Sequence, residues 1–202
     1  VENKPISREA LGIMFWPDSA DSQQQVRIAL SDIRKQLGNQ IFIEQRNPIW
    51  VKSNAISVDV LQFHKIGTAS EIIDAELTEI TELIDVANDC FLSGFTLRGC
   101  PNFDAWLQLE EQVALRDLQR CYRLVIRSLE RNSRIEEAIT YTRQLIHLDP
   151  YNEEHYRLLM QFHAQNRELH QVETVHQWVK QTLENELGVD PDQKTQALYL
   201  QI

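Results

Sequence analysis

The sequence predicts a mainly α-helical protein: a partial winged helix-turn-helix with a β-hairpin wing, followed by a tetratricopeptide-like α-solenoid or helical bundle. Three observations support this fold class. Two helix patterns and a hairpin pattern occupy residues 8–51. From about residue 70 onward only helical periodicity remains. A weak internal repeat marks the C-terminal part of the chain.

The first helix is expected over residues 8–15. Ser7 is a natural N-cap because its hydroxyl can accept a hydrogen bond from the first turn. Trp16-Pro17 should end the helix, since proline cannot continue a helix interior. A second helix is expected to begin soon after this proline.

The second helix leads into a hairpin. Ser22 and Gln25 fit a capping box and Gly38 is suited to close the helix, which gives a length of about fifteen residues. Two short apolar runs, residues 41–43 and 49–51, then flank a polar turn, as in a β-hairpin. Two helices followed by a hairpin predict a winged helix.

Only helices are expected from about residue 70. Four apolar residues between residues 73 and 84 recur at steps of four, three and four, which places them on one face of a helix ending near residue 89. Residues 90–102 contain two glycines and a proline and should form a loop. A long helix is expected over residues 106–130, and the next should run from a cap signal at Ser133 and Glu136 to the turn at Asp149-Pro150. A third should begin at the cap residue Asn152, and a fourth should cover residues 168–187 and be closed by Gly188. A short last helix is expected after Asp192. The residues expected to face inward are Ile73, Leu77, Ile80 and Ile84 on the earlier helix and Leu109, Val113, Leu118, Cys121, Val125 and Leu129 on the long one.

These helices carry a weak internal repeat. Residues 148–150 (LDP) recur in outline as residues 189–191 (VDP), each time between two helices and 41 residues apart. Antiparallel helix pairs at such a period predict an α-solenoid related to tetratricopeptide repeats, whose stacks bind partners. Leu145 should then be buried between stacked helices. A plain helical bundle, in which the two Asp-Pro turns coincide by chance, is the alternative.

The charge distribution points to the early part of the chain. The formal net charge of -10 argues against nucleic-acid binding, because a binding surface must offset phosphate charge. Residues 22–52, however, hold five basic and two acidic side chains. Any contact with nucleic acid is therefore expected within residues 22–52.

The second helix divides into an apolar and a polar side. Its apolar stripe is expected to pack on its own domain. A helix in the major groove needs this division, with amide, hydroxyl and guanidinium groups turned toward the bases. The ordinary wet face of an amphipathic helix is the alternative, although the hairpin behind it favours DNA binding. The stripe consists of Val26, Leu30, Ile33 and Leu37, and the candidate DNA-binding residues are Gln24, Arg27, Ser31, Arg34 and Lys35, with Arg46 at the hairpin tip.

Catalytic and membrane functions find little support in the sequence. The six histidines are scattered, and no nucleophile elbow, P-loop or dinucleotide fingerprint is present. We therefore expect no enzyme activity, no cofactor and no metal. The three cysteines show no paired spacing, and no apolar run approaches the roughly 20 residues that span a bilayer. A cytoplasmic protein without membrane contact is expected.

Several stretches of the chain resemble a known family. Residues 7–11 (SREAL), 16–18 (WPD) and 29–38 (ALSDIRKQLG) are similar to the latter part of the response-regulator type winged helix of Streptomyces antibiotic regulatory proteins. The chain also resembles the bacterial transcriptional activator domain that follows the winged helix in that family. Its likeness lies in residues 58–60 (VDV) with Phe63, residues 92–95 (LSGF) with Trp106, Glu110-Glu111, and residues 186–191 (ELGVDP), the last being the strongest signal.

The resemblance implies a transcriptional activator that binds direct repeats as a dimer or higher assembly and recruits RNA polymerase. It implies that residues 1–56 are the C-terminal part of a winged-helix DNA-binding domain and that residues 57–202 are the helical activator domain. The polar residues of the second helix then match the recognition helix, and Arg46 matches the wing. The expected partners are promoter DNA, RNA polymerase and a second copy of the chain.

In that family a β-sheet and one further helix precede the segment with which this chain begins. A fragment with weak DNA affinity of its own is therefore expected, with an apolar patch that favours self-association. The alternative function is a protein-binding adaptor whose early helices serve only as a structural cap. The residues expected to be only partly covered are Leu11, Met14, Phe15, Val26, Leu30 and Ile33.

Overall fold

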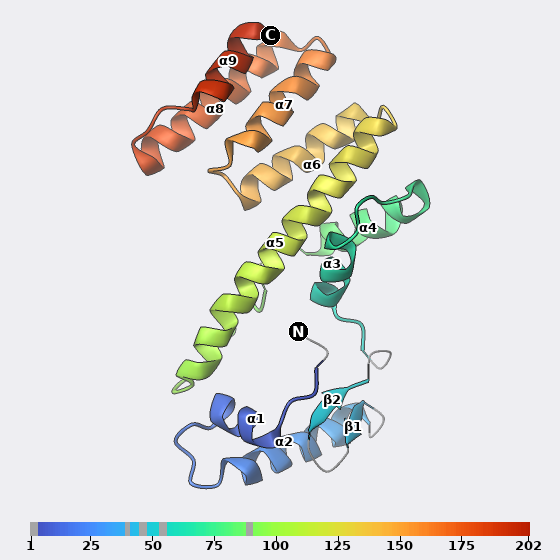
Figure 1. The fold of residues 1–202 in the computed structure, drawn as a ribbon, viewed down its shortest axis with the longest axis vertical. Coiled ribbons are helices and arrows are strands. Elements are labelled where there is room, and N and C mark those ends of the chain that lie inside the picture. Colours follow the sequence, from blue (N-terminus) through green and yellow to red (C-terminus); the bar gives the residue numbers. More distant parts are fainter. Residues whose placement is uncertain (1–3, 39–40, 45–47, 53–55, 88–90) are drawn as a thin grey trace. The chain divides into compact units, whose positions relative to one another are not determined.

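The computed structural model describes residues 4–38, 41–44, 48–52, 56–87 and 91–202. It is mainly helical with one two-stranded antiparallel sheet, as the sequence predicted (Figure 1). In order, the elements are α1 (Arg8–Phe15), α2 (Ser22–Leu37), β1 (Phe42–Glu44), β2 (Ile49–Val51), α3 (Asp59–Gly67), α4 (Asp74–Val86), α5 (Pro101–Arg131), α6 (Ile135–Leu148), α7 (Glu153–Gln165), α8 (Leu169–Leu187) and α9 (Gln193–Gln201).

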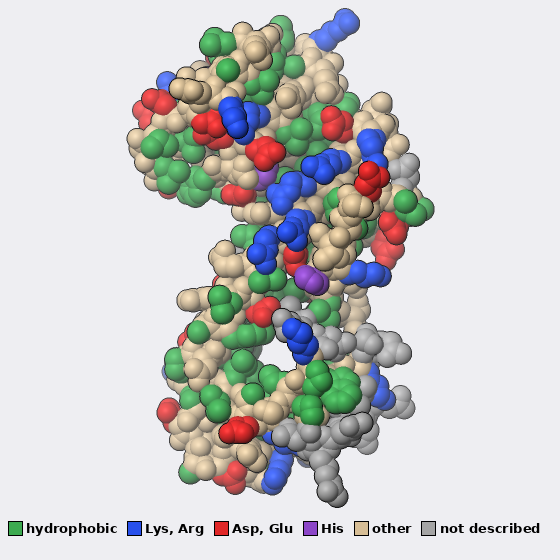
Figure 2. Space-filling view, viewed as in Figure 1, with side chains coloured by type: hydrophobic (Ala, Val, Ile, Leu, Met, Phe, Trp, Pro, Cys, Tyr) green, Lys and Arg blue, Asp and Glu red, His purple; other side chains and the backbone are tan. Residues whose placement is uncertain are grey.

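The chain divides into two compact units. Unit 1 comprises Val1–Lys65 and Ala87–Arg116, and unit 2 comprises Ile66–Val86 and Asp117–Ile202. Unit 1 therefore holds α1, α2, the hairpin and the first half of α5, whereas unit 2 holds α4, the second half of α5 and all later helices. Apolar side chains reach the surface of both units (Figure 2).

Side-chain caps set the limits of the first two helices. The Ser7 hydroxyl accepts a hydrogen bond from the Ala10 amide at 3.0 Å, as expected for the N-cap of α1. The N-cap of α2 is Asp21 rather than Ser22, because the Asp21 carboxylate accepts the Gln24 amide at 3.0 Å. Gly38 closes α2 at a φ of 91°, a conformation that favours glycine.

A close approach fixes α1 against α2. A methyl group on Gly12 would lie 2.6 Å from the Ser22 hydroxyl oxygen and 2.9 Å from its Cβ, so the helices can cross here only because residue 12 has no side chain. Next to this crossing, three buried residues from α2 and the hairpin form a small core. They are Val26, Leu30 and Ile49, against which Leu11 and Trp16 pack.

The hairpin is tied to the stretch before α1. β1 and β2 pair antiparallel with Ile43 opposite Trp50, in the segments that the sequence predicted. Ile6 exchanges two backbone hydrogen bonds of 2.8 Å with Ile49, which extends the sheet by one bridge. This bridge holds the segment before α1 against the edge of β2.

The first turns of α5 contact the end of α1. Phe103 is buried among Phe15, Phe95 and Trp106, with ring centroids 5.5 to 5.7 Å apart. The Cys100 thiol also donates a hydrogen bond to the Phe15 carbonyl at 3.2 Å. α5 begins at the proline of residue 101, earlier than predicted, because proline is well suited to the first helical position.

Unit 2 has the larger core. Leu145 is fully buried there, as predicted, together with Tyr156, Leu159 and Met160. On α4, the expected inward residues Leu77, Ile80 and Ile84 are buried, but Ile73 lies just before the helix and is 64% exposed. On α5, Leu118, Cys121, Val125 and Leu129 are buried and Val113 is half-buried, whereas Leu109 in unit 1 is 69% exposed, contrary to expectation.

Two matching turns reveal the repeat more clearly than the Asp-Pro pairs do. Ser133 and Arg167 both have positive φ, 57° and 60°, and lie 34 residues apart. After each, an amide reaches back to the helix before it: Arg134 to the Leu129 carbonyl at 2.9 Å and Glu168 to the His163 carbonyl at 2.8 Å. The spacing is that of tetratricopeptide repeats. Ser133 therefore lies in the turn that follows α5 and does not cap α6, whose N-cap position is Arg134.

Candidate nucleic-acid interface

The polar side of α2 faces solvent. Gln24, Arg27, Ser31 and Lys35 are exposed and Arg34 is half-buried. At about 100° per residue these five side chains fall within an arc of roughly 100°, and Val26 and Leu30 lie beside it on the buried side. Because the buried side is fixed by Ile49 of the hairpin and by α1, the polar arc is held on a rigid support. Figure 1 shows α2 lying alongside the hairpin within unit 1.

Two of the basic residues also have a structural explanation. Arg34 and Lys35 lie in the last turn of α2, where positive charge complements the helix dipole. The Lys35 ammonium donates to the Asp32 carboxylate at 3.3 Å, but both side chains are more than half exposed, so the pair adds little stability. Arg27 and Gln24 are farther from that end of the helix, so the dipole does not account for them.

Ile28 is an apolar residue that the sequence reasoning missed. It is 48% exposed and borders the polar arc next to Gln24 and Lys35. An apolar side chain at this place could contact a thymine methyl group. The sequence could have indicated this residue, because Ile28 is apolar and yet does not belong to the apolar stripe of α2.

The apolar stripe of α2 is covered over only half its length. Val26 and Leu30 are buried, contrary to the expectation that both would be partly uncovered, because Ile49, Leu11 and Trp16 pack over them. Ile33 is 38% exposed, and Leu37, which was expected to face the core, is 63% exposed. The uncovered part is thus the C-terminal half. Leu11, Met14 and Phe15 are half-buried, as expected.

The proposed wing residue Arg46 lies outside the described residues. Of the hairpin, the structure describes the paired backbone of β1 and β2, and Lys52 just beyond it. The Lys52 amide donates to the Ile41 carbonyl at 2.8 Å, which prolongs the pairing by one step. The hairpin as a fold element is therefore confirmed, and the role of its tip stays a prediction.

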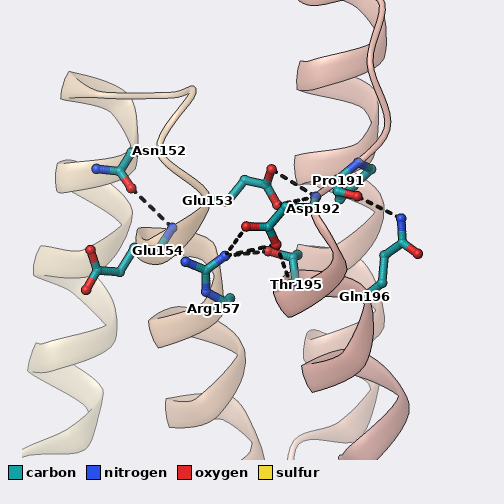
Figure 3. Close-up of polar contacts among 8 residues, drawn as sticks. All are labelled: Asn152, Glu153, Glu154, Arg157, Pro191, Asp192, Thr195 and Gln196. Carbon is teal, nitrogen blue, oxygen red and sulfur yellow. Dashed lines mark hydrogen bonds and ion pairs between the residues drawn. The ribbon is translucent and has the colours of Figure 1, made fainter.

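Unit 2 contains a polar network at the N-termini of α7 and α9 (Figure 3). Arg157 donates to the Asp192 carboxylate at 3.3 Å and to the buried Thr195 hydroxyl at 2.8 Å. Glu153 accepts the Asp192 amide at 2.9 and 3.0 Å. The Thr195 amide donates to Asp192 at 2.7 Å, and this bond is the main reason why the pKa of Asp192 is lowered. The contacts of Arg157 and Glu153 hold α9 against α7, and the Thr195 amide bond caps α9, so the network is structural.

The described residues hold neither a metal-binding cluster nor a membrane-spanning helix. Among the described residues, no group of three or more His, Cys, Asp or Glu side chains is placed to hold a metal ion. The helices that the structure describes include none that is long and apolar enough to cross a membrane. Of the surfaces singled out from the sequence, the polar side of α2 is thus the one that the structure presents as an assembled, solvent-facing set.

The comparisons with known proteins agree with this architecture. The chain resembles the solved structure of Mycobacterium tuberculosis EmbR in complex with a low affinity phosphopeptide, with a TM-score of 0.66 and 16% identity. The likeness covers 98% of this chain and 55% of EmbR, so the chain spans about half the length of that protein. A search of curated proteins found no significant match.

A family comparison is more specific. Residues 58–202, which run from just before α3 to the end of the chain, match the family described as the Bacterial transcriptional activator domain. The matched stretch is well over half of the 202 residues. It contains both matching turns and every helix of unit 2. The chain therefore belongs to the bacterial transcriptional activator domain family.

Proposed function

We propose that this chain is the promoter-binding and protein-binding part of a transcriptional activator, in which α2 lies in the major groove. The observation that carries the proposal is the exposed set Gln24, Arg27, Ser31 and Lys35 on a helix whose adjacent apolar side is packed, through Val26 and Leu30, against the hairpin. In this proposal residues 1–56 form the winged-helix part and residues 57–202 the activator part.

The chemistry of the arc suits base and phosphate contacts. An arginine such as Arg27 can donate two parallel hydrogen bonds to guanine, and Gln24 can pair in a similar way with adenine. Lys35, near the end of the helix, is better placed to neutralise a phosphate group. The five basic and two acidic side chains of residues 22–52 give this segment the opposite charge to the chain as a whole.

The hairpin and the helical unit take different roles. Arg46 at the hairpin tip is proposed to contact the adjacent backbone or minor groove, as the wing of such domains does. The helical hairpins of the activator domain are proposed to contact RNA polymerase and a second copy of the chain, because stacked helix pairs present extended surfaces for protein partners. Chemical catalysis has no part in this function.

Selection of duplexes from a randomised library tests the DNA-binding part. We expect the chain to enrich a defined sequence, and Arg27→Ala to weaken binding of that sequence by about 1 to 3 kcal/mol while relaxing preference at one base pair. Arg98→Ala, an exposed basic residue of unit 1 outside the arc, is the matched control and should bind as the unsubstituted chain does. Unchanged binding in Arg27→Ala and Arg34→Ala alike would contradict the assignment of α2.

A protein-binding adaptor without DNA binding is the second candidate. The net charge of -10 and the dominance of helical hairpins favour it. It predicts that the chain enriches no duplex sequence.

The uncovered residues Ile13, Ile33 and Leu37, which are 52%, 38% and 63% exposed, give either function a route to self-association. Sedimentation of the chain and of Leu37→Glu should then differ in oligomeric state.

A further inference from the structure

The C-terminal half of α5 carries a line of arginines. Arg120, Arg123 and Arg127 follow one another at steps of three and four, which places them in one narrow stripe along the helix. Arg120 and Arg127 are exposed and Arg123 is half-buried. We call these three residues the arginine ridge. The opposite side of the same half of α5 consists of the buried residues Leu118, Cys121, Val125 and Leu129.

The ridge is only partly neutralised by the protein. Arg120 lies 3.9 Å from the buried carboxylate of Asp117. One turn beyond the ridge, Arg131 pairs with Glu71 at 3.0 Å. Within the described part of the chain, no carboxylate lies within 4.0 Å of Arg123 or Arg127. Like charges three and four residues apart repel one another, so the folded helix keeps an unbalanced positive stripe.

A buried histidine lies near the middle of the ridge. His155, on α7, is 2% exposed, and neither of its ring nitrogens has a hydrogen-bond partner. Burial is the main cause that lowers the pKa of His155, and the positive charge of Arg123 acts in the same direction, whereas the carboxylates of Asp149 and Glu154 and the backbone of Asp149 raise it. A polar ring without partners is uncommon in a protein interior. A carboxylate bound to Arg123 would therefore also change the electrostatic environment of the His155 ring.

We propose that the arginine ridge is a docking surface for an acidic segment of a partner protein, with Asp or Glu at alternate positions of an extended chain. Arginine forks bind carboxylates through two parallel hydrogen bonds, which favours this chemistry. Arg123 and Arg127 are four residues apart, or about 6 Å along the helix axis. Alternate residues of an extended segment are about 6.6 Å apart, so their carboxylates match this spacing.

The surroundings favour a short acidic segment over a nucleic acid. Residues 66–86 and 117–202, which make up unit 2, contain 19 acidic and 10 basic side chains. A long polyanion would meet this excess of negative charge on either side of the ridge. A short segment would contact the ridge alone. Figure 2 shows several Lys and Arg side chains over α5 and α6 in that view, with acidic side chains among and around them. The proposal does not depend on whether α2 binds DNA.

Fluorescence anisotropy with the whole chain tests this proposal. The probe is a fluorescein-labelled decapeptide of alternating Glu and Ser, titrated at low ionic strength, with a Lys-Ser decapeptide as the charge-reversed probe. We expect the Glu-Ser probe to bind and the Lys-Ser probe not to bind. Arg123→Ala/Arg127→Ala should weaken binding of the Glu-Ser probe about tenfold or more, because two charge-assisted contacts are lost.

The matched control removes two charges elsewhere in unit 2. Lys180→Ala/Lys194→Ala changes exposed residues of α8 and α9 and should bind the probe within about twofold of the unsubstituted chain. An equal loss in both double variants would show binding by net charge alone and would overturn the proposal. The proposal would also be overturned if a 12-base-pair DNA duplex bound more tightly than the Glu-Ser probe and the ridge variant abolished that binding.

A second measurement does not depend on the variants. The ring resonances of His155 should shift when the Glu-Ser probe is added, and the pKa of His155 should rise, because a carboxylate then offsets the charge of Arg123. His176, which lies on α8, is the internal control and should not respond. Probe binding that leaves the His155 signals unchanged would place the occupied surface elsewhere and contradict the proposal.

Discussion

The two units are held together in different ways. In unit 1, the core below the α1–α2 crossing has three buried side chains, Val26, Leu30 and Ile49, and the apolar stripe of α2 continues beyond it into solvent. In unit 2, consecutive helical hairpins enclose many fully buried side chains, Leu145 and Tyr156 among them. The contrast shows that α2 depends on a few close contacts, whereas the hairpins share their stability among many.

The largest expected effect is in the core of unit 2. Leu145→Ala should lower the free energy of unfolding by about 2 to 5 kcal/mol, because Leu145 is fully buried and its loss leaves a cavity. Urea denaturation followed by circular dichroism measures the change. Leu200→Ala, at a side chain that is 83% exposed, is the control and should change stability by less than about 0.5 kcal/mol. Equal denaturation midpoints for the two variants would break the comparison.

A smaller effect is expected where unit 1 depends on one contact. Gly12→Ala places a methyl group 2.6 Å from the Ser22 hydroxyl and 2.9 Å from its Cβ, so rotation of the hydroxyl cannot relieve the overlap. The cost should be about 1 to 3 kcal/mol, confined to unit 1. Hydrogen exchange should rise in α1 and α2 and stay unchanged in α7. Gly67→Ala, whose methyl would meet its neighbours at 3.4 Å or more, serves as the tolerated control.

The cap of α9 should give a pH-dependent effect. The pKa of Asp192 is lowered in the folded state, first by the hydrogen bond from the Thr195 amide. Its contribution to stability is therefore present above the unfolded pKa of about 3.9 and is lost as pH falls through the lower folded value. Asp192→Ala should cost about 1 kcal/mol at pH 7. The difference from the unsubstituted chain should shrink in unfolding measurements as the pH falls below the unfolded pKa of about 3.9.

The smallest effect is expected on the polar side of α2. Lys35→Ala removes the exposed contact with Asp32 and should change the free energy of unfolding by less than about 0.5 kcal/mol. Thermal unfolding of both forms measures this difference. A large loss of stability would mean that Lys35 has a structural role, which would weaken its assignment to a binding surface.

Local signals in the sequence predicted most of unit 1. Ser7, Pro17 and Gly38 mark helix ends through backbone chemistry that depends on neighbouring residues alone, and the helices begin or end beside them. The N-cap of α2 was misplaced by one residue, because Asp21 and Ser22 are both good caps and only the geometry of the chain entering the helix decides between them. The helix α3 was not predicted from periodicity, because it is short.

What depends on packing between distant segments could not be predicted. The burial of Val26 and Leu30 and the exposure of Leu37 follow from where Ile49 and α1 reach along α2, which periodicity does not contain. The arginine ridge was also missed, since the long helix was interpreted by its apolar side alone. The 34-residue spacing was missed because Ser133 and Arg167 share a backbone conformation and not a residue type.

The turns at Ser133 and Arg167 bear on how this domain family changes over time. Each turn is closed by backbone hydrogen bonds, and neither following helix has a side-chain N-cap bond, so Ser133 and Arg167 themselves need no particular side chain, although Arg134 and Glu168 beside them pair with Glu137 and His163. Substitutions can accumulate there without opening the hairpin, provided that each new residue tolerates a positive φ. The junctions should therefore drift faster than the helices beside them.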